Sequence, residues 1–148
     1  MSVAIFNMNS NQLMEYTNLF VSVFNSEPWN DSWTEKTAMT RIENMMKTNT
    51  FIGKAIFCDN DLKGVIWGQK EQSYDGIHFH IQEFCVKTIE QNKGYGKALL
   101  NALREELSSI GVTSTYLITS RGERTEAYYK KRGFITSDNM ILMTDSYK

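Results

Sequence analysis

The chain has 148 residues, a net charge of −1 at pH 7 and a hydrophobic fraction of 41%. This length suits one domain with a real core, so we expect a single domain over residues 1–148. The hydrophobic fraction argues against disorder, and the lack of a Lys/Arg block in the sequence argues against a nucleic-acid partner. Cys58 and Cys85 lie in apolar, strand-like surroundings, which favours reduced thiols over a disulfide framework.

The N-terminal sequence MSVAIFNMNSNQ has no basic segment followed by an apolar core. No run of about 18 apolar residues follows elsewhere in the sequence, so neither a signal peptide nor a membrane span is predicted. We therefore expect a cytoplasmic protein without a membrane partner.

The first half of the chain predicts two helices and then a meander of strands. The expected elements are a strand at 3–8, a helix at 11–25, a break at 26–30, a helix from a capping box at Ser32–Glu35 to about 47, and strands at 51–58, 62–72 and 77–86. Turns are expected at 59–61 and 73–76, and Gly64 and Gly68 are possible bulges in the middle strand.

The second half predicts a helix, a strand, a helix and a strand. Apolar residues at Leu99, Leu103 and Leu107 fall on one face of the first helix, and Gly111 is its expected C-cap. Strands are expected at 116–119 and 140–144. The full order is β-α-α-β-β-β-α-β-α-β, an α/β class with a mixed sheet flanked by helices.

The stretch from Gln91 to Gly96, with the sequence QNKGYG, is the strongest site signal. It follows a predicted strand and opens a predicted helix, whose unpaired N–H groups and dipole favour an anion. The two glycines let the backbone approach a bulky phosphate. A Rossmann turn needs a third glycine where Leu99 stands, and a P-loop needs a hydroxyl where Ala98 follows Gly96-Lys97. An ordinary strand-to-helix turn remains the alternative.

A second motif, Tyr129-x-x-x-Gly133-Phe134, follows that helix and the next strand. Together, Q-x-x-G-x-G and Y-x-x-x-G-F resemble the acyl-CoA loop and the tyrosine helix of the GNAT N-acetyltransferase superfamily. The order and spacing match from about Phe79 to Phe134. The resemblance implies that acetyl-CoA is the co-substrate and that an amine receives the acetyl group.

The resemblance also implies roles for particular residues. Glu83 is the expected general base and Tyr129, rather than its neighbour Tyr128, the general acid; His80 is the rival base because imidazole titrates near neutral pH. The backbone of the strand end would hold the pantetheine, with the Val86 N–H facing the thioester oxygen. The expected cofactor-binding residues are Phe84, Cys85, Val86, Gln91, Asn92, Lys93, Gly94, Tyr95, Gly96 and Lys97.

His78 and His80 share one face of a strand by the period of two, and Glu83 lies on the other face unless a bulge intervenes. A bare H-x-H without a third ligand is a weak zinc signal, so we expect no metal. The chain departs from the family where Gln91 replaces the usual Arg and Lys87-Thr88 replaces the end of a V-x-P exit. No clear Asn stands at 120–124, where the family often has a cofactor contact.

The connection between the first two helices is expected to bind the acceptor. Trp29, Asp31 and Trp33 suit an apolar and acidic wall for a cationic amine, with His80 nearby and Trp67 and Tyr74 as possible additions. Packing of the tryptophans onto the sheet is the alternative. Aminoglycoside, polyamine, amino-acid and protein N-terminal or lysine acceptors all stay open, and we favour a small cationic amine. A non-catalytic acyl-CoA sensor and a nucleotide-binding α/β domain are the competing functions. The resemblance also allows a homodimer.

Overall fold

The computed structural model describes residues 2–147 of the chain. The chain divides into two compact units, Met1–Leu117 and Ile118–Lys148. The expected single domain over 1–148 therefore stays a prediction.

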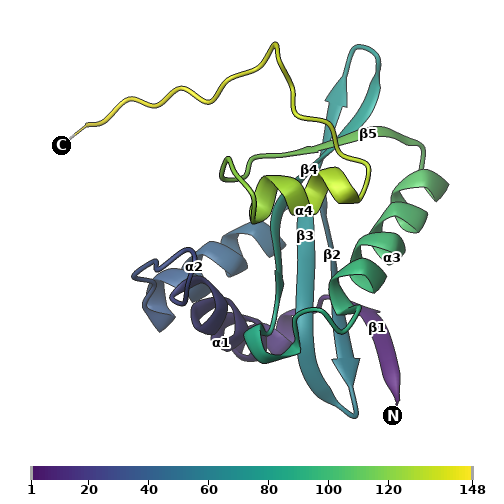
Figure 1. Ribbon diagram of the computed structural model, residues 1–148. Coiled ribbons are helices and arrows are strands. Elements are labelled where there is room, and N and C mark those ends of the chain that lie inside the picture. The colour runs from purple at the N-terminus through teal and green to yellow at the C-terminus, as the bar shows by residue number, and fades with distance from the viewer. Residues whose placement is uncertain (1, 148) are drawn as a thin grey trace. The chain divides into compact units, whose positions relative to one another are not determined.

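The first unit is a five-stranded sheet with helices on both faces. Its elements are β1 (Val3–Asn7), η1 (Ser10–Gln12), α1 (Leu13–Phe24), α2 (Glu35–Met46), β2 (Phe51–Cys58), β3 (Asp61–Ser73), β4 (Gly76–Val86), η2 (Thr88–Glu90), α3 (Tyr95–Ser109) and β5 (Val112–Leu117). The strands follow the order β1-β2-β3-β4-β5. All neighbours are antiparallel except β4 and β5, which are parallel. Figure 1 shows α1 and α2 on one face and α3 on the other. The predicted mixed α/β sheet is confirmed.

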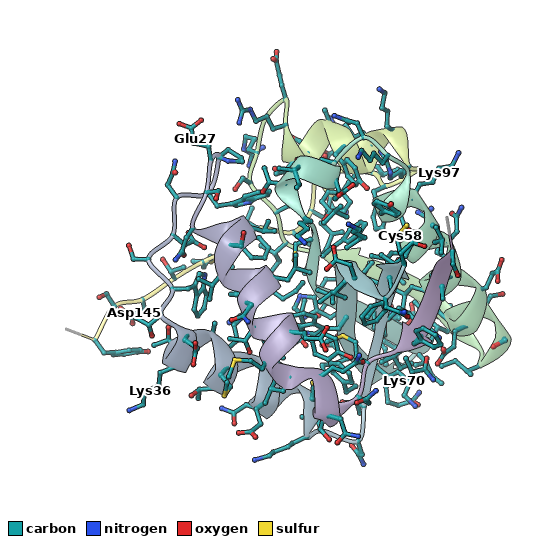
Figure 2. The ribbon with its side chains drawn as sticks, turned by 90° about the horizontal axis from the view of Figure 1, so that it is seen from below. Glu27, Lys36, Cys58, Lys70, Lys97 and Asp145 are labelled. Atoms are coloured by element: carbon teal, nitrogen blue, oxygen red, sulfur yellow. The ribbon has the colours of Figure 1, made fainter. Side chains whose placement is uncertain are left out.

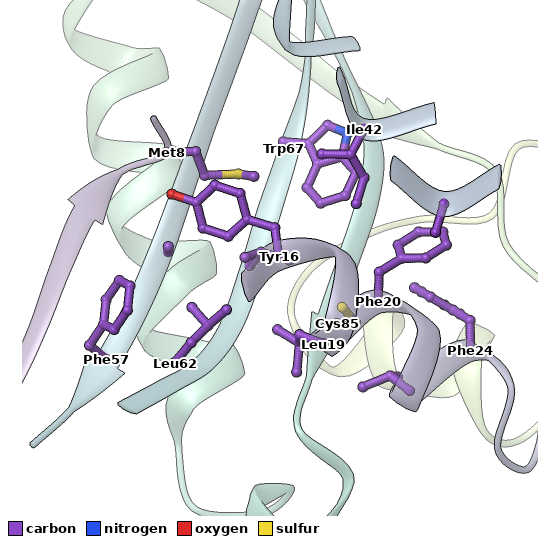
Figure 3. Close-up of a cluster of buried hydrophobic side chains, with 14 residues drawn as sticks. Met8, Tyr16, Leu19, Phe20, Phe24, Ile42, Phe57, Leu62, Trp67 and Cys85 are labelled. Atoms are coloured by element: carbon purple, nitrogen blue, oxygen red, sulfur yellow. The ribbon is translucent and has the colours of Figure 1, made fainter. Parts of the chain in front are cut away.

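Alternation along the strands divides the buried side chains between the two faces. Tyr16 and Phe20 of α1 pack with Ile42 of α2 and with Trp67 of β3, in the cluster shown in Figure 3. Ile66, the neighbour of Trp67, is also fully buried but lies outside that cluster. Leu99 and Leu103 of α3 are likewise fully buried outside it. Both faces of the central strands are therefore covered, which fixes the register of the sheet.

Both predicted bulges are present: one lies in the pairing of β3 with β2, at Gly64, and the other in its pairing with β4, at Gly68. The register shifts between Ile56 and Phe57 opposite Gly64, and again between Trp67 and Gly68. A Cβ on Gly68 would collide with the carbonyl oxygen of His80, so only glycine fits this close approach of two backbones.

The start of α2 differs from the expected capping box at Ser32–Glu35. Thr34 is the N-cap: its Oγ1 accepts a hydrogen bond from the Thr37 N–H, and Thr37 Oγ1 accepts one from the Thr34 N–H, both at 3.0 Å. Two overlapping patterns, S-x-x-E and T-x-x-T, compete at this point in the sequence. Asn25 fixes the backbone of Trp33 from both sides, at 2.8 and 2.9 Å, which keeps residue 33 outside the helix and leaves residue 34 as the cap.

The second unit contains α4 (Thr125–Lys131), which ends in a Schellman motif. The Phe134 N–H donates to the Tyr129 carbonyl and the Gly133 N–H to the Lys130 carbonyl, both at 3.1 Å. Gly133 has a φ of +93°, the left-handed conformation that this motif requires. The rings of Tyr129 and Phe134 are in contact, with centroids 5.5 Å apart. The Y-x-x-x-G-F motif is therefore also a helix stop.

The last predicted strand, 140–144, is wrong for this structure. Residues 135–147 form no helix or strand, and Met140, Ile141, Leu142 and Met143 are all exposed. Their β propensity is high, but a strand also needs a neighbour for its backbone groups. None of the sheet ladders of the described residues includes this segment.

Candidate active site

The bulge in β4 decides which way Glu83 faces. Trp67 is opposite Glu83 but the next residue, Gly68, is opposite Ile81, so Gln82 is the extra residue. Gln69, two residues from Trp67, is opposite His80. Directly opposite residues share a face, so Glu83 and His80 lie on the same face, toward α1 and α2. Simple alternation places them on opposite faces unless a bulge intervenes, and a bulge does intervene at Gln82.

Glu83 is paired with Arg41 of α2. Arg41 Nε donates to Glu83 Oε2 at 2.8 Å, and a terminal guanidinium nitrogen lies 2.7 Å from the same oxygen. The Glu83 side chain is only 12% exposed, against 38% for Arg41. A nearly buried carboxylate thus has one oxygen clamped by a cation, and Oε1 is left outside that pair.

Burial raises the pKa of Glu83 above its usual value, because desolvation disfavours the carboxylate. The charge and hydrogen bonds of Arg41 lower the pKa, and the charge of Asp31 raises it a little. A carboxyl group with a raised pKa is suited to accept a proton near neutral pH.

The two histidines of β4 have separate partners. His80 stacks on Tyr116 of β5, with ring centroids 4.6 Å apart, and the Tyr116 hydroxyl donates to Glu71. Burial lowers the pKa of His80 and the charge of Glu71 opposes that shift. His78 Nε2 lies 2.8 Å from an oxygen of Asp75. Among residues 2–147, no group of three or more His, Cys, Asp or Glu side chains is arranged to hold a metal ion.

The connection before α2 forms a short wall beside the Arg41–Glu83 pair. Trp33 Nε1 donates to Asp31 Oδ2 at 3.0 Å, and the Arg41 guanidinium carbon lies 5.6 Å from the centroid of the Trp33 ring. An open depression of about 500 Å³ is lined by Asp31, Ser32, Trp33 and Thr37. Asp31 and Trp33 therefore lie where an acceptor can reach them.

The indoles also pack, as the alternative reading expected. Trp33 meets Phe20 edge to face with centroids 4.9 Å apart, and Trp29 meets Phe24 at 5.1 Å. Trp67 is fully buried in the core, and Tyr74 is almost fully exposed at the β3–β4 turn. Neither of these two lies in the wall formed by Asp31 and Trp33.

The end of β4 offers backbone rather than side chains. The ladder between β4 and β5 ends where Ile81 is opposite Leu117, while pairing with β3 continues to Val86. Residues 82–86 are thus paired only on their β3 side in the ladders of the described strands. The Cys85 side chain is buried, and burial raises the pKa of its thiol, so only its backbone is available to a ligand. Cys58 and Cys85 are both free thiols.

The loop before α3 has an open, positively polarised end. Gly94 is the N-cap residue, with a φ of +87° and no side-chain cap, and a Cβ built on it would meet nothing within 4 Å. Asn92 also has a positive φ, of 72°. The uncapped N–H groups of the first turn of α3 and this empty space fit an anionic group such as a pyrophosphate.

The side chains of this loop take different roles. Gln91 Nε2 donates to the Val86 carbonyl at 3.2 Å, which ties the loop to the end of β4. Lys93 Nζ lies 3.0 Å from Glu90, while Lys97 is exposed and extends outward in Figure 2. Tyr95 is buried at the start of α3, so its contribution to an anion site would come from its N–H group. Gly96 follows within the first turn of α3.

Tyr129 lies in the second unit, on α4, and is half-buried between two aromatic rings. Its ring centroid is 5.3 Å from that of Tyr128 and 5.5 Å from that of Phe134. The Arg132 guanidinium carbon lies 3.6 Å from the centroid of the Tyr128 ring. Burial raises the pKa of Tyr128, and Arg132 opposes that shift. The two tyrosines therefore have different neighbours within the same turn of helix.

The structure adds one residue that the sequence reasoning missed, Arg41. A signal was available, because Ala38, Arg41, Ile42 and Met45 fall at the i, i+3, i+4 and i+7 positions of one helix face. An arginine on the apolar face of an amphipathic helix needs a buried or half-buried acidic partner.

The sequence profile of the Acetyltransferase (GNAT) family matches residues 13–134. That range is most of the chain and extends from the first unit into the second. The protein belongs to the GNAT acetyltransferase family, as the motif resemblance implied, and is an acyltransferase. A comparison of its sequence with curated proteins found no significant match.

Many solved structures have this fold, and three of them are 12–16% identical to this chain. A possible acetyltransferase from Clostridium difficile 630 aligns with a TM-score of 0.85 and 12% identity, covering 100% of both chains. An aminoglycoside acetyltransferase from an uncultured soil metagenomic sample, in complex with sisomicin, aligns with a TM-score of 0.75 and 16% identity, and the alignment covers 99% of this chain and 96% of that one. A ribosomal-protein-alanine N-acetyltransferase from Brucella melitensis aligns with a TM-score of 0.77 and 13% identity, and the alignment covers 98% of this chain and 100% of that one. Similarity at this level of sequence identity supports the fold.

None of the helices described is long and apolar enough to cross a membrane.

Proposed function

We propose that the protein transfers the acetyl group of acetyl-CoA to a primary amine of a small cationic acceptor, by direct attack in a ternary complex. One observation carries the proposal: Glu83, a nearly buried carboxylate, lies on β4, whose last residues are outside the β4–β5 ladder and precede the uncapped start of α3. A proton acceptor would then lie on the same strand as the backbone that would hold a thioester. A single domain over residues 1–148 is part of the proposal, because the family profile matches residues of both units.

The residues that would bind acetyl-CoA act mainly through their backbone. The backbone N–H groups of residues 84–86, on the side of β4 away from β3, would hold the pantetheine, with that of Val86 facing the thioester oxygen. The start of α3, from Gly94 to Lys97, would receive the pyrophosphate, and Lys93 would add positive charge after leaving Glu90. Acetyl-CoA, when bound, supplies the acetyl group as a thioester.

Three proton transfers would complete the reaction. Glu83 Oε1 accepts one proton from the acceptor ammonium, directly or through a water, so that the nitrogen can attack the acetyl carbon as a neutral amine. As the C–N bond forms and the C–S bond breaks, Tyr129 gives a proton to the sulfur and is recharged by the second proton that the nitrogen loses. One proton is released to solvent in each turnover. His80 remains the rival base, although its stacking on Tyr116 makes it the less available group.

The acceptor class follows from the wall beside Glu83. Asp31 and Glu83 supply two carboxylates against the single cation Arg41, and Trp33 supplies an aromatic face. Such a site attracts a monovalent or polyvalent ammonium. Proteins with this fold include an aminoglycoside acetyltransferase, whose acceptor is a small molecule, and a ribosomal-protein-alanine N-acetyltransferase, whose acceptor is a protein.

The first test is thermal unfolding with and without acetyl-CoA, with ATP and NAD as controls. A ligand at about a hundred times its dissociation constant adds about 2.7 kcal/mol of stability, so the expected result is a higher midpoint with acetyl-CoA alone. No shift at millimolar acetyl-CoA would overturn the co-substrate assignment. A shift with ATP or NAD instead would favour the nucleotide-binding alternative.

The second test is turnover, read out as free thiol, with a panel containing an aminoglycoside, a polyamine, an amino acid and an N-terminal peptide. We expect activity with at least one small cationic amine, and we expect Glu83→Gln and Tyr129→Phe to slow it without weakening acetyl-CoA binding. Binding without turnover on any amine would favour an acyl-CoA sensor. Activity on the peptide alone would favour a protein acceptor.

A further inference from the structure

Arg41 is the one charged side chain within the first unit that bonds directly to Glu83, among the contacts of the described residues. It comes from α2, whereas Glu83 is on β4, so this pair joins a helix to the sheet. Both of its short contacts are with Oε2. The clamp therefore fixes the rotation of the carboxylate without covering Oε1.

Arg41 is held in place by its contact with Trp33 and by the burial of the next residue in the helix. Its guanidinium lies over the Trp33 ring, and the Trp33 backbone is held on both sides by Asn25. Its neighbour in sequence, Ile42, is fully buried in the core between α1, α2 and the sheet. The guanidinium therefore approaches Glu83 from a fixed direction, at the end of a rigid chain of contacts.

We propose that Arg41 is a positioning residue for acetyl transfer: it holds Glu83 as a carboxylate by binding Oε2 and leaves Oε1 free to accept the proton of the acceptor. This inference rests on the proposed function, because it assumes that Glu83 is the base. Other charged or titratable groups act on Glu83 less directly. Asp31 acts on it through charge alone, and Cys85, two residues along β4, is a buried thiol.

The consequence for pH dependence has a definite sign. Burial raises the pKa of Glu83 and Arg41 lowers it. Without Arg41 the burial effect is unopposed, so Glu83 should hold its proton to a higher pH. Because only the carboxylate can act as a base, the acid limb of the kcat profile should move to higher pH.

The test compares Arg41→Met and Arg41→Lys with Lys47→Met. Lys47 is the matched control, since it is also a cation at α2 with its own ion pair, to Glu43 at 3.7 Å, but has no contact with the site. Arg41→Met should move the acid limb up by about one pH unit or more and lower kcat, with little change in the acetyl-CoA dissociation constant. Arg41→Lys should keep the acid limb of the kcat profile at its wild-type pH but should have only part of the wild-type kcat. The reason is that the lysine ammonium keeps the positive charge but lacks the planar pair of N–H donors of the guanidinium. Lys47→Met should match the wild type in all three quantities.

A second readout does not depend on turnover. In protein labelled with ¹³C at glutamate carboxyl groups, the Glu83 resonance is assigned by its loss in Glu83→Gln and is then titrated in the wild type and in Arg41→Met. We expect its midpoint to rise by about one unit or more when Arg41 is removed. An unchanged midpoint together with an unchanged kcat profile would overturn the role of Arg41. A shifted midpoint in a protein that turns over no amine would contradict the proposed function and leave the clamp standing as a structural fact.

Discussion

Helices α2 and α3 begin in opposite ways. The start of α2 is closed by Thr34 and Thr37, whose hydroxyls satisfy each other's backbone N–H groups. The start of α3 follows Gly94, which has no side chain to offer, and no acidic residue stands in the first turn. A closed start stabilises the fold, whereas an open start leaves N–H donors for a partner from outside. The comparison separates a residue's value for folding from its value for binding.

The sharpest test of the open start exchanges one glycine for alanine at each end of α3. Gly94 and Gly111 have φ values of +87° and +88°, and neither has an atom within 4 Å of a built Cβ. Each substitution should lower the free energy of unfolding by about 1 kcal/mol, because alanine is strained at positive φ. Only Gly94→Ala should also weaken acetyl-CoA binding, by about tenfold, measured by calorimetry. Equal losses of affinity in both variants would mean that α3 matters to binding only as a whole.

The closed start predicts the reverse pattern. Thr34→Ala removes the side-chain acceptor for the Thr37 N–H and should lower the free energy of unfolding by about 1 kcal/mol, seen in urea denaturation. The acetyl-CoA dissociation constant should not change. The Thr34→Ala/Thr37→Ala double variant should lose less stability than the sum of the single variants, because both remove the same reciprocal pair. A Thr34→Ala variant that kept its stability but lost binding would break the distinction.

The smallest expected effect concerns the lysine of the open start. Lys93→Met should weaken acetyl-CoA binding by about threefold, because one charge near a helix N-terminus contributes about 0.6 kcal/mol to anion binding. The salt dependence of binding should fall as well. Thermal stability should stay within error, since the Lys93–Glu90 pair is at the surface on the Lys93 side. Lys97→Met, which removes an exposed lysine in the first turn of α3, should have the weaker effect; the opposite ranking would argue against a phosphate beside Lys93.

Local patterns predicted the regular elements well. The limits of β2, Phe51–Cys58, were predicted from an apolar run that ends in a polar turn, and both the run and the turn are local signals in the sequence. The glycine-rich loop was predicted as a helix start, and Gly94 is the N-cap residue of α3, with a positive φ. Such features depend on the conformational freedom of single residues, which sequence carries directly.

The misses come from contacts that are distant in sequence. Alternation along β4 could not reveal that Gln82 is an extra residue, because that depends on the close approach of Gly68 to His80. Thr34 replaced Ser32 as the cap because Asn25 fixes the intervening backbone. The strand at 140–144 failed because strand formation is a property of a pair. Arg41 was missed because its partner lies 42 residues away.

The extra residue Gln82 divides β4 into two parts with independent reading frames. Upstream of it, even-numbered residues such as His80 face α1 and α2, and downstream the odd-numbered residues Glu83 and Cys85 do. Deleting Gln82 would bring the strand into one frame and turn one of the two sets of side chains to the opposite face of the sheet. Without this residue, His80 and Glu83 could not both face α1 and α2.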